Sequence, residues 1–188
     1  MLTNNISGAF EGRLYFADSH LRSFEARVTS CREEKGKSLV TLSESAFFPE
    51  GGGQKGDRGT IGGAPVTDTI EKNGTVYHVC ASPLAVGERV KCEIDWPLRF
   101  SRMQAHSGEH MVSGIAHSLF ACENVGFHMG EDGVIIDFDR YLDESQLREI
   151  ELAANKAIWE NRPVRAFFPS PEELAELDYR SKLELTEN

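Results

Sequence analysis

The sequence predicts an α+β protein in which a small β-barrel-like domain precedes an α+β domain. Short runs of alternating apolar and polar residues recur over about the first 95 residues, separated by Gly- and Asn-containing turns. After Trp96-Pro97 the apolar residues follow the three-to-four spacing of a helix. We therefore expect a β-barrel domain over residues 1–95, which contains a glycine-rich motif, and a second domain over residues 96–188.

Six short strands are predicted in the first domain, a number typical of a small barrel or sandwich. Their turns include Lys35–Lys37 and Lys72–Gly74. The strands are Arg13–Ala17, Ser23–Ser30, Ser38–Ser43, Ala64–Ile70, Thr75–Cys80 and Arg89–Asp95.

The second half alternates helices and strands. A helix over residues 97–120 carries an apolar stripe of Met103, Met111, Ile115 and Leu119, and a strand over residues 133–139 follows. The pair Asp143 and Gln146 predicts the start of a second helix. Its apolar stripe is Leu147, Ile150, Ala154, Ala157 and Ile158, and Pro163 ends it. A short strand, Val164–Phe168, leads to a third helix capped by Ser170, with Pro171 and Glu173 in its first turn.

Composition limits the class of partner. The net charge is −10, and residues 101–188 carry 8 basic and 17 acidic side chains, which is −9 of that total. Nucleic-acid binders usually show a basic footprint, so any RNA contact must rest on a local patch. The candidates lie near the N-terminus, where the alternative is a solvated strand face: Arg13, Arg22, Arg27, Arg32, Lys35 and Lys37.

Membrane and secretory signals are not found in the sequence. No apolar stretch approaches the roughly 18 residues that span a bilayer, and the start lacks a secretory signal. The four cysteines form no CxxC pair, which favours reduced thiols. We expect a cytoplasmic protein with no membrane partner, and the oligomeric state stays open.

The sharpest chemical signal is His106-Ser107-Gly108-Glu109-His110. Histidines at i and i+4 lie on one face of a helix, where they can share a divalent metal, and imidazole suits zinc. The alternative is two unconnected surface histidines. Gly108 weakens the helix by about 1 kcal/mol relative to Ala, which favours a close approach of substrate or metal.

The second signal is the glycine-rich motif FFPEGGGQKGDRG, residues 47–59. Three glycines allow positive φ and a close approach of backbone to a ligand. It is no Walker A loop, because no GK[ST] ends it. We expect a structured turn, with Gly51, Gly52, Gly53 and Gln54 binding substrate beside the histidines; a flexible linker is the alternative.

These two motifs, in this order, resemble those of the free-standing alanyl-tRNA editing proteins and of alanyl-tRNA synthetase editing regions. The resemblance covers nearly the whole chain from about Arg13, including residues 149–173. It implies hydrolysis of the ester that joins a wrong amino acid, serine or glycine, to alanine tRNA. It also implies a zinc ion held by His106, His110 and a later CxxxH pair.

The sequence departs from that pattern because no CxxxH follows His110. We expect the chain to stop before that motif, with the two remaining zinc ligands beyond Asn188. Two histidines fill half of a tetrahedral site, so the chain as given is predicted to bind zinc weakly or not at all, and to be inactive if it binds none.

Two further residues are candidates for catalysis. His128 precedes a predicted strand, in a stretch that the resemblance assigns to an amino-acid-pocket loop, where it would contact substrate or move protons. Glu109 is the nearby carboxylate and a candidate general base, although it lies 100° around the helix from His110. His117 is interpreted as structural.

Two other functions stay open. Residues 106–110 also spell the H-x-x-E-H signature of a zinc peptidase, with Glu109 as base and a third ligand among Glu172, Glu173 and Glu176. A tRNA-binding module without activity is the other alternative.

Overall fold

The computed structural model describes residues 12–130, 133–164, 167, 169–177 and 179, and the predicted α+β class with an N-terminal barrel is confirmed. The chain divides into two compact units, residues 1–154 and 155–188, and each is described by itself. The predicted domain boundary near Trp96 stays a prediction. No helix among the described residues has the length and apolar character needed to cross a membrane.

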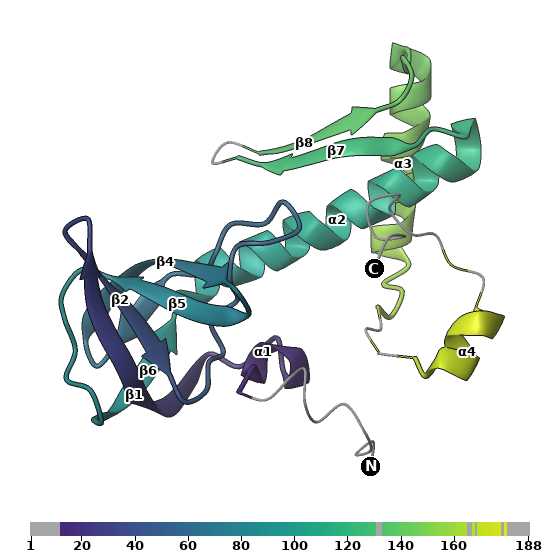
Figure 1. The fold of residues 1–188 in the computed structure, drawn as a ribbon. Helices are drawn as coiled ribbons and strands as arrows, with labels where there is room; N and C mark the ends of the chain where they lie inside the picture. The colour runs from purple at the N-terminus through teal and green to yellow at the C-terminus, as the bar shows by residue number, and fades with distance from the viewer. Residues whose placement is uncertain (1–11, 131–132, 165–166, 168, 178, 180–188) are drawn as a thin grey trace. The chain divides into compact units, whose positions relative to one another are not determined.

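Six antiparallel strands close into a barrel (Figure 1). Neighbouring strands follow the order β1-β2-β5-β4-β3-β6, and β6 pairs back with β1. The strands are β1 (Ser23–Glu34), β2 (Lys37–Leu42), β3 (Gly59–Ile61), β4 (Ala64–Lys72), β5 (Thr75–Cys80) and β6 (Arg89–Ile94).

Both predicted hairpin turns are confirmed. Lys35 and Gly36 connect β1 to β2 with φ of 53° and 74°, and Asn73 and Gly74 connect β4 to β5 with φ of 51° and 75°. Two successive left-handed residues match the right-handed twist of the flanking strands, which is why Gly and Asn occur there. Alternate strand residues then face a core made of Ala26, Val28, Val40, Ala46, Phe47, Ile61, Val66, Cys80, Val90, Cys92 and Ile94.

The sequence prediction was wrong at two places in the barrel. The segment predicted as a strand at Arg13–Ala17 forms a short helix, α1 (Leu14–Ala17), because β1 already pairs with β2 and β6 and offers this segment no free edge. Strand β3 was missed because its three residues are too few to alternate. Gly59 permits β3 to approach β6, since a Cβ there would overlap the Glu93 carbonyl.

Helix α2 (Trp96–Phe120) leads from the barrel, and the hairpin of β7 (Asn124–Met129) and β8 (Val134–Phe138) lies beside it (Figure 1). The predicted apolar stripe on this helix is not its buried face, because all four of its members are half-buried or exposed. The helix instead buries Arg99, Arg102, Glu109, Ser113 and Ala116. The buried face of α2 is therefore mainly polar.

A small second core lies at the far end of α2. It consists of Ala116, Cys122, Leu142 and Ile150, so helix α3 (Glu144–Trp159) packs here through Ile150. Asp143 and Gln146 cap α3 reciprocally, as predicted. Of the stripe predicted for α3, Ile150 and Ala154 are buried, whereas Leu147 and Ile158 are more than half exposed.

The unit over residues 155–188 contains helix α4 (Pro171–Glu176). Its predicted start is confirmed, since Ser170 and Glu173 form a capping box. Val164 and Phe167 are not in a strand, so the strand predicted for Val164–Phe168 is not found at them, and its other residues lie outside the described ones.

Candidate functional site

His106 and His110 stack on one face of α2. Their ring centroids lie 5.0 Å apart and the rings are inclined by 19°. Glu109 completes a group whose potential ligand atoms all lie within 4.8 Å of one another. Among the described residues, this is the group in which three His, Cys, Asp or Glu side chains lie close enough to hold one metal ion.

The glycine-rich motif forms a tight turn, as predicted. The amide of Gly51 donates to the carbonyl of Gln54 and the amide of Gln54 donates to the carbonyl of Gly51, each at 3.0 Å. The two central residues, Gly52 and Gly53, have φ of 58° and 78°. Residues with a side chain rarely adopt this left-handed backbone twice in succession, which accounts for the glycines.

The turn, the hairpin and the helix meet around His106. A Cβ at Gly53 would overlap the Phe127 ring of β7, and that ring stacks on His106 at 5.6 Å between centroids. From the turn, the side-chain carbonyl of Gln54 accepts a hydrogen bond from His106 Nδ1 at 3.0 Å. Gln54 is buried, whereas Gly51, Gly52 and Gly53 are exposed.

Two arginines one turn apart bind the same loop to the start of α2. Arg99 Nε donates to Asp57 Oδ2 at 2.7 Å, and both side chains are almost fully buried. Arg102 donates to the carbonyl of Gly56 at 2.6 Å. Residues 99, 102 and 106 thus contact residues 57, 56 and 54 in reverse order along the helix. The three contacts hold the turn in register with His106.

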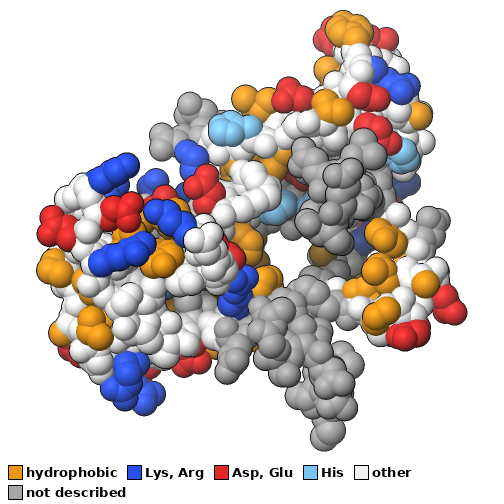
Figure 2. Space-filling view, viewed as in Figure 1, with side chains coloured by type: hydrophobic (Ala, Val, Ile, Leu, Met, Phe, Trp, Pro, Cys, Tyr) orange, Lys and Arg blue, Asp and Glu red, His pale blue; other side chains and the backbone are white. Residues whose placement is uncertain are grey.

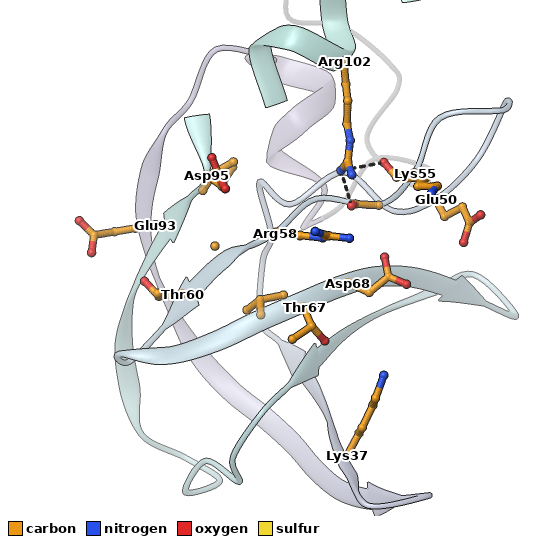
Figure 3. A pocket seen from close by; sticks show the side chains of 14 residues that line it. Lys37, Glu50, Lys55, Arg58, Thr60, Thr67, Asp68, Glu93, Asp95 and Arg102 are labelled. Atoms are coloured by element: carbon orange, nitrogen blue, oxygen red, sulfur yellow. Dashed lines mark hydrogen bonds between the residues drawn. The ribbon is translucent and has the colours of Figure 1, made fainter. Parts of the chain in front are cut away.

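The Arg102 guanidinium is buried where it binds the loop. Burial lowers the pKa of Arg102 below its ordinary value, since the charged form loses water there. The guanidinium donates hydrogen bonds to the backbone carbonyls of Lys55 and Gly56, as the dashed lines in Figure 3 show. Those bonds compensate the buried charge and fix the position of the loop.

Arg102 also lines a groove of about 1040 Å³ on the outside of the barrel (Figure 3). None of the site histidines lines it. Its charged side chains balance, with Lys37, Lys55, Arg58 and Arg102 against Glu50, Asp68, Glu93 and Asp95. Basic and acidic side chains are likewise interspersed on the face of the barrel in Figure 2. This surface provides no concentrated positive charge for an RNA backbone.

Glu109 is enclosed on the side of α2 that faces the hairpin. Its side chain is completely buried, whereas that of His110 is 62% exposed. Glu109 Oε1 accepts hydrogen bonds from Ser113 Oγ at 2.8 Å and from Asn124 Nδ2. Glu109 Oε2 lies 3.5 Å from His110 Nδ1.

The other predicted histidines lie apart from this group. His128 was expected in a loop, but it is exposed on strand β7, next to Phe127. Successive residues of a strand point to opposite faces, so His128 points away from the face on which Phe127 meets His106. His117 pairs with Glu123 at 2.8 Å, in agreement with a structural role.

Sequence reasoning missed five residues that build the surroundings of the site: Arg99, Arg102, Ser113, Asn124 and Phe127. One signal could have found some of them, since positions 99, 102, 106, 109 and 113 share the three-to-four spacing of one helix face. Asn124 and Phe127 gave no such signal, because their contacts depend on how the hairpin packs on α2.

The donor set of this group fits zinc. Two imidazoles are ligands that zinc accepts, and a metal-binding His usually directs its other ring nitrogen to a carboxylate or carbonyl. Here His106 Nδ1 meets the Gln54 carbonyl and His110 Nδ1 faces the Glu109 carboxylate. Each histidine would therefore coordinate through Nε2.

Comparison with known proteins places the chain among editing factors. A family model described as tRNA synthetases class II (A) matches residues 19–98. Alanyl-tRNA editing protein AlaX-M of Methanosarcina acetivorans is 33% identical over 177 residues, which cover 87% of this chain and 71% of that protein. AlaX-L of Pyrococcus horikoshii is 36% identical over 172 residues, covering 87% of this chain and 43% of that protein. Aarsd1 of Bos taurus is 34% identical over 161 residues, which cover 78% of this chain and 36% of that protein. The chain thus spans less than half the length of the latter two.

Proposed function

The chain belongs to the alanyl-tRNA editing protein family, and from this premise we propose that it takes part in hydrolysing wrongly aminoacylated alanine tRNA. The reaction would be cleavage of the ester between a seryl or glycyl group and the 3′ end of the tRNA. Water supplies the hydroxyl of the released acid, and its proton goes to the departing tRNA oxygen. A cytoplasmic place of action is part of the proposal.

The contact between Gln54 and His106 supports this proposal most directly. It joins the glycine-rich motif to the HxxxH motif at one point, although the residues are 52 positions apart. A turn whose only task was to connect strands would need no buried amide aimed at a helix histidine. The contact therefore favours one site assembled from both motifs.

His106 and His110 are the proposed zinc ligands, with Glu109 beside them. Zinc, when bound, would polarise a carbonyl or a water molecule. The surrounding residues of the chain orient the His106 ring and shield it. Gln54 holds the His106 ring, and Phe127 stacks on that ring and covers one side of it.

The exposed backbone of Gly51, Gly52 and Gly53 is the proposed contact for the aminoacyl end of the tRNA. A Cβ at Gly51 or Gly52 would meet no atom within 4 Å, so the backbone there is open to an approaching ligand. His128 remains a proposed catalytic or substrate-binding residue, with less structural support than His106 and His110. Its exposure and its strand direction set it on the other face from His106.

The two alternatives are not favoured. As a peptidase base, Glu109 would have to reach a water molecule, but its side chain has no exposed surface. A binding module without activity would leave the arrangement of two histidines and their oxygen partners unexplained. Family membership argues against both alternatives.

The test is a deacylation assay with seryl- and glycyl-tRNA for alanine, with and without added zinc, and with a peptide substrate in parallel. We expect ester hydrolysis that depends on zinc, and no peptide cleavage. Replacing both His106 and His110 by Ala should lower the rate by several orders of magnitude. His117→Ala is the matched control, because this histidine lies on the same helix and pairs with Glu123.

Circular dichroism would show that the double variant keeps its fold. Hydrolysis that survives both replacements would rule out the metal-centred site. Unchanged tRNA ester in the presence of excess zinc, with intact wild-type protein that has bound the zinc, would favour the binding module instead.

A further inference from the structure

We infer that Glu109 is a positioning residue that fixes the tautomer of His110, and that Ser113 and Asn124 hold its carboxylate for this task. The inference rests on the proposed function only where it concerns zinc. It concerns Glu109 as a partner of the imidazole rather than as a general base that takes a proton from water.

The first observation is the burial of Glu109. The residue is 2% exposed, yet its two partners in the group are less buried: His106 is half-buried and His110 is exposed. A buried carboxylate is costly unless hydrogen bonds compensate its charge. The hydrogen bonds and charges around Glu109 must therefore compensate the cost of burying its carboxylate.

The two carboxylate oxygens have different surroundings. Oε1 accepts from Ser113 Oγ and Asn124 Nδ2, and Asn124 Nδ2 also reaches Ser113 Oγ at 2.9 Å. Oε2 has no hydrogen-bond partner among the described residues. His110 Nδ1 lies 3.5 Å from this oxygen.

Strand β7 is shaped so that Asn124 can reach Glu109. Its pairing with β8 is interrupted by a bulge between Asn124 and Gly126, and Asn124 Oδ1 accepts from the Gly126 amide at 3.0 Å. That bond turns the amide nitrogen of Asn124 toward Glu109. A bulge often serves to re-aim a side chain in this way.

An acceptor-only oxygen beside Nδ1 selects the tautomer with its proton on Nδ1. Nε2 of His110 then carries a lone pair and faces outward on a ring that is largely exposed. The tautomer is the one that zinc needs for coordination through Nε2. The same carboxylate would also keep the ring from rotating away from His106.

The decisive variant is Glu109→Gln. Its amide oxygen can still accept from Ser113 and Asn124, but its NH₂ group then faces His110 Nδ1. A donor at that position demands an acceptor, so the proton should move to Nε2. The matched control is Glu123→Gln, which changes the carboxylate that faces His117 Nδ1 near the other end of the helix.

The experiment is a long-range ¹H–¹⁵N spectrum of the full chain labelled in histidine, with chelator present, at about pH 8, where imidazoles are generally neutral. We expect His110 to carry its proton on Nδ1 in the wild type and in Glu123→Gln, and on Nε2 in Glu109→Gln. A proton on Nε2 in the wild-type protein would overturn the inference without any variant. An unchanged tautomer in folded Glu109→Gln would overturn it too.

Zinc affinity, measured by competition with a chromophoric chelator, is the second readout. We expect Glu109→Gln to bind zinc roughly 10- to 100-fold more weakly than the wild type, and Glu123→Gln to bind it equally well. If tRNA ester hydrolysis fails while the tautomer behaves as expected, the proposed function is wrong and the positioning role stands. The reverse pattern would refute the positioning role alone.

Discussion

Gln54 Oε1 accepts a hydrogen bond from His106 Nδ1 across 3.0 Å, and this bond connects a loop of the barrel to the helix that carries the histidines. The loop and the helix that carry these two residues are joined by further contacts. The loop is fixed through Asp57 and Gly56, and the helix through Arg99 and Arg102. The orientation of the His106 ring is therefore set by the barrel as well as by the helix.

Gln54→Ala should weaken zinc binding and ester hydrolysis by roughly 10- to 100-fold, because it removes the acceptor that orients His106. Chelator competition and the deacylation assay measure the two effects. Gln104→Ala, at an exposed position of the same helix, should change neither. Equal values for Gln54→Ala and the wild type would show that the bond has no part in the site.

Much of the fold could be predicted because it follows from local patterns. Five of the six barrel strands alternate visibly, and the turns at Gly36 and Gly74 and the cap at Ser170 depend on the chemistry of a few neighbouring residues. Strand β3 depends instead on pairing with β6, which is distant in sequence, as well as with its hairpin neighbour β4. Three residues with a glycine carry no pattern of their own.

The candidate site divides in the same way. The spacing of His106 and His110 is a property of one helix and could be seen in the sequence. The pair formed by Arg99 and Asp57 spans 42 positions, and nothing local indicates that these two charges are buried together. Likewise, nothing local to Glu109 indicates that its side chain is buried and accepts a hydrogen bond from Asn124 of the hairpin.

Asp57→Asn should destabilise the protein by about 3–5 kcal/mol, because it leaves the Arg99 charge buried without its counter-charge. Both side chains are at most 2% exposed, so water cannot compensate for the loss. Urea unfolding measures the change. The control is Glu25→Gln, whose carboxylate pairs with Arg89 on the surface and should contribute little. Equal stability losses for the two variants would contradict the interpretation that the buried pair of Arg99 and Asp57 stabilises the fold.

Gly53→Ala should impair the site far more than Gly52→Ala. Both residues have a positive φ, so both variants share a strain of roughly 1–2 kcal/mol. Only at Gly53 would the added methyl overlap Phe127, and Phe127 stacks on His106. A displacement of about 1 Å at a reacting group can cost roughly 100-fold in rate.

The deacylation rates of the two folded glycine variants test this difference. We expect the rate of Gly53→Ala to fall well below that of Gly52→Ala. If Gly52→Ala is equally slow, the substrate contact of the exposed backbone limits the rate at both positions, and the packing of Gly53 on Phe127 is secondary.

His78 should make the stability of the barrel depend on pH. The side chain is fully buried, with Nδ1 donating to the Val40 carbonyl at 3.0 Å and Nε2 accepting from Ser45 Oγ at 2.8 Å. Burial lowers the pKa of His78 from 6.5 to about 4. Between these two values the unfolded chain binds a proton that the folded chain does not, so stability rises with pH in this window. The contribution is complete above pH 6.5 and is lost as the pH falls to about 4.

The loss should amount to about 3 kcal/mol, from 1.36 kcal/mol for each pKa unit. Urea unfolding of the wild type between pH 7 and pH 4.5 would show it, and His78→Gln isolates it because glutamine does not titrate there. Carboxylates contribute to acid destabilisation in both proteins, so the difference between the two slopes belongs to His78. If the variant folds poorly, the histidine resonances of the wild type give the same answer. A His78 signal that titrates near pH 6.5 in the folded protein would contradict the prediction, because a neutral, buried imidazole between Val40 and Ser45 has to resist protonation well below that pH.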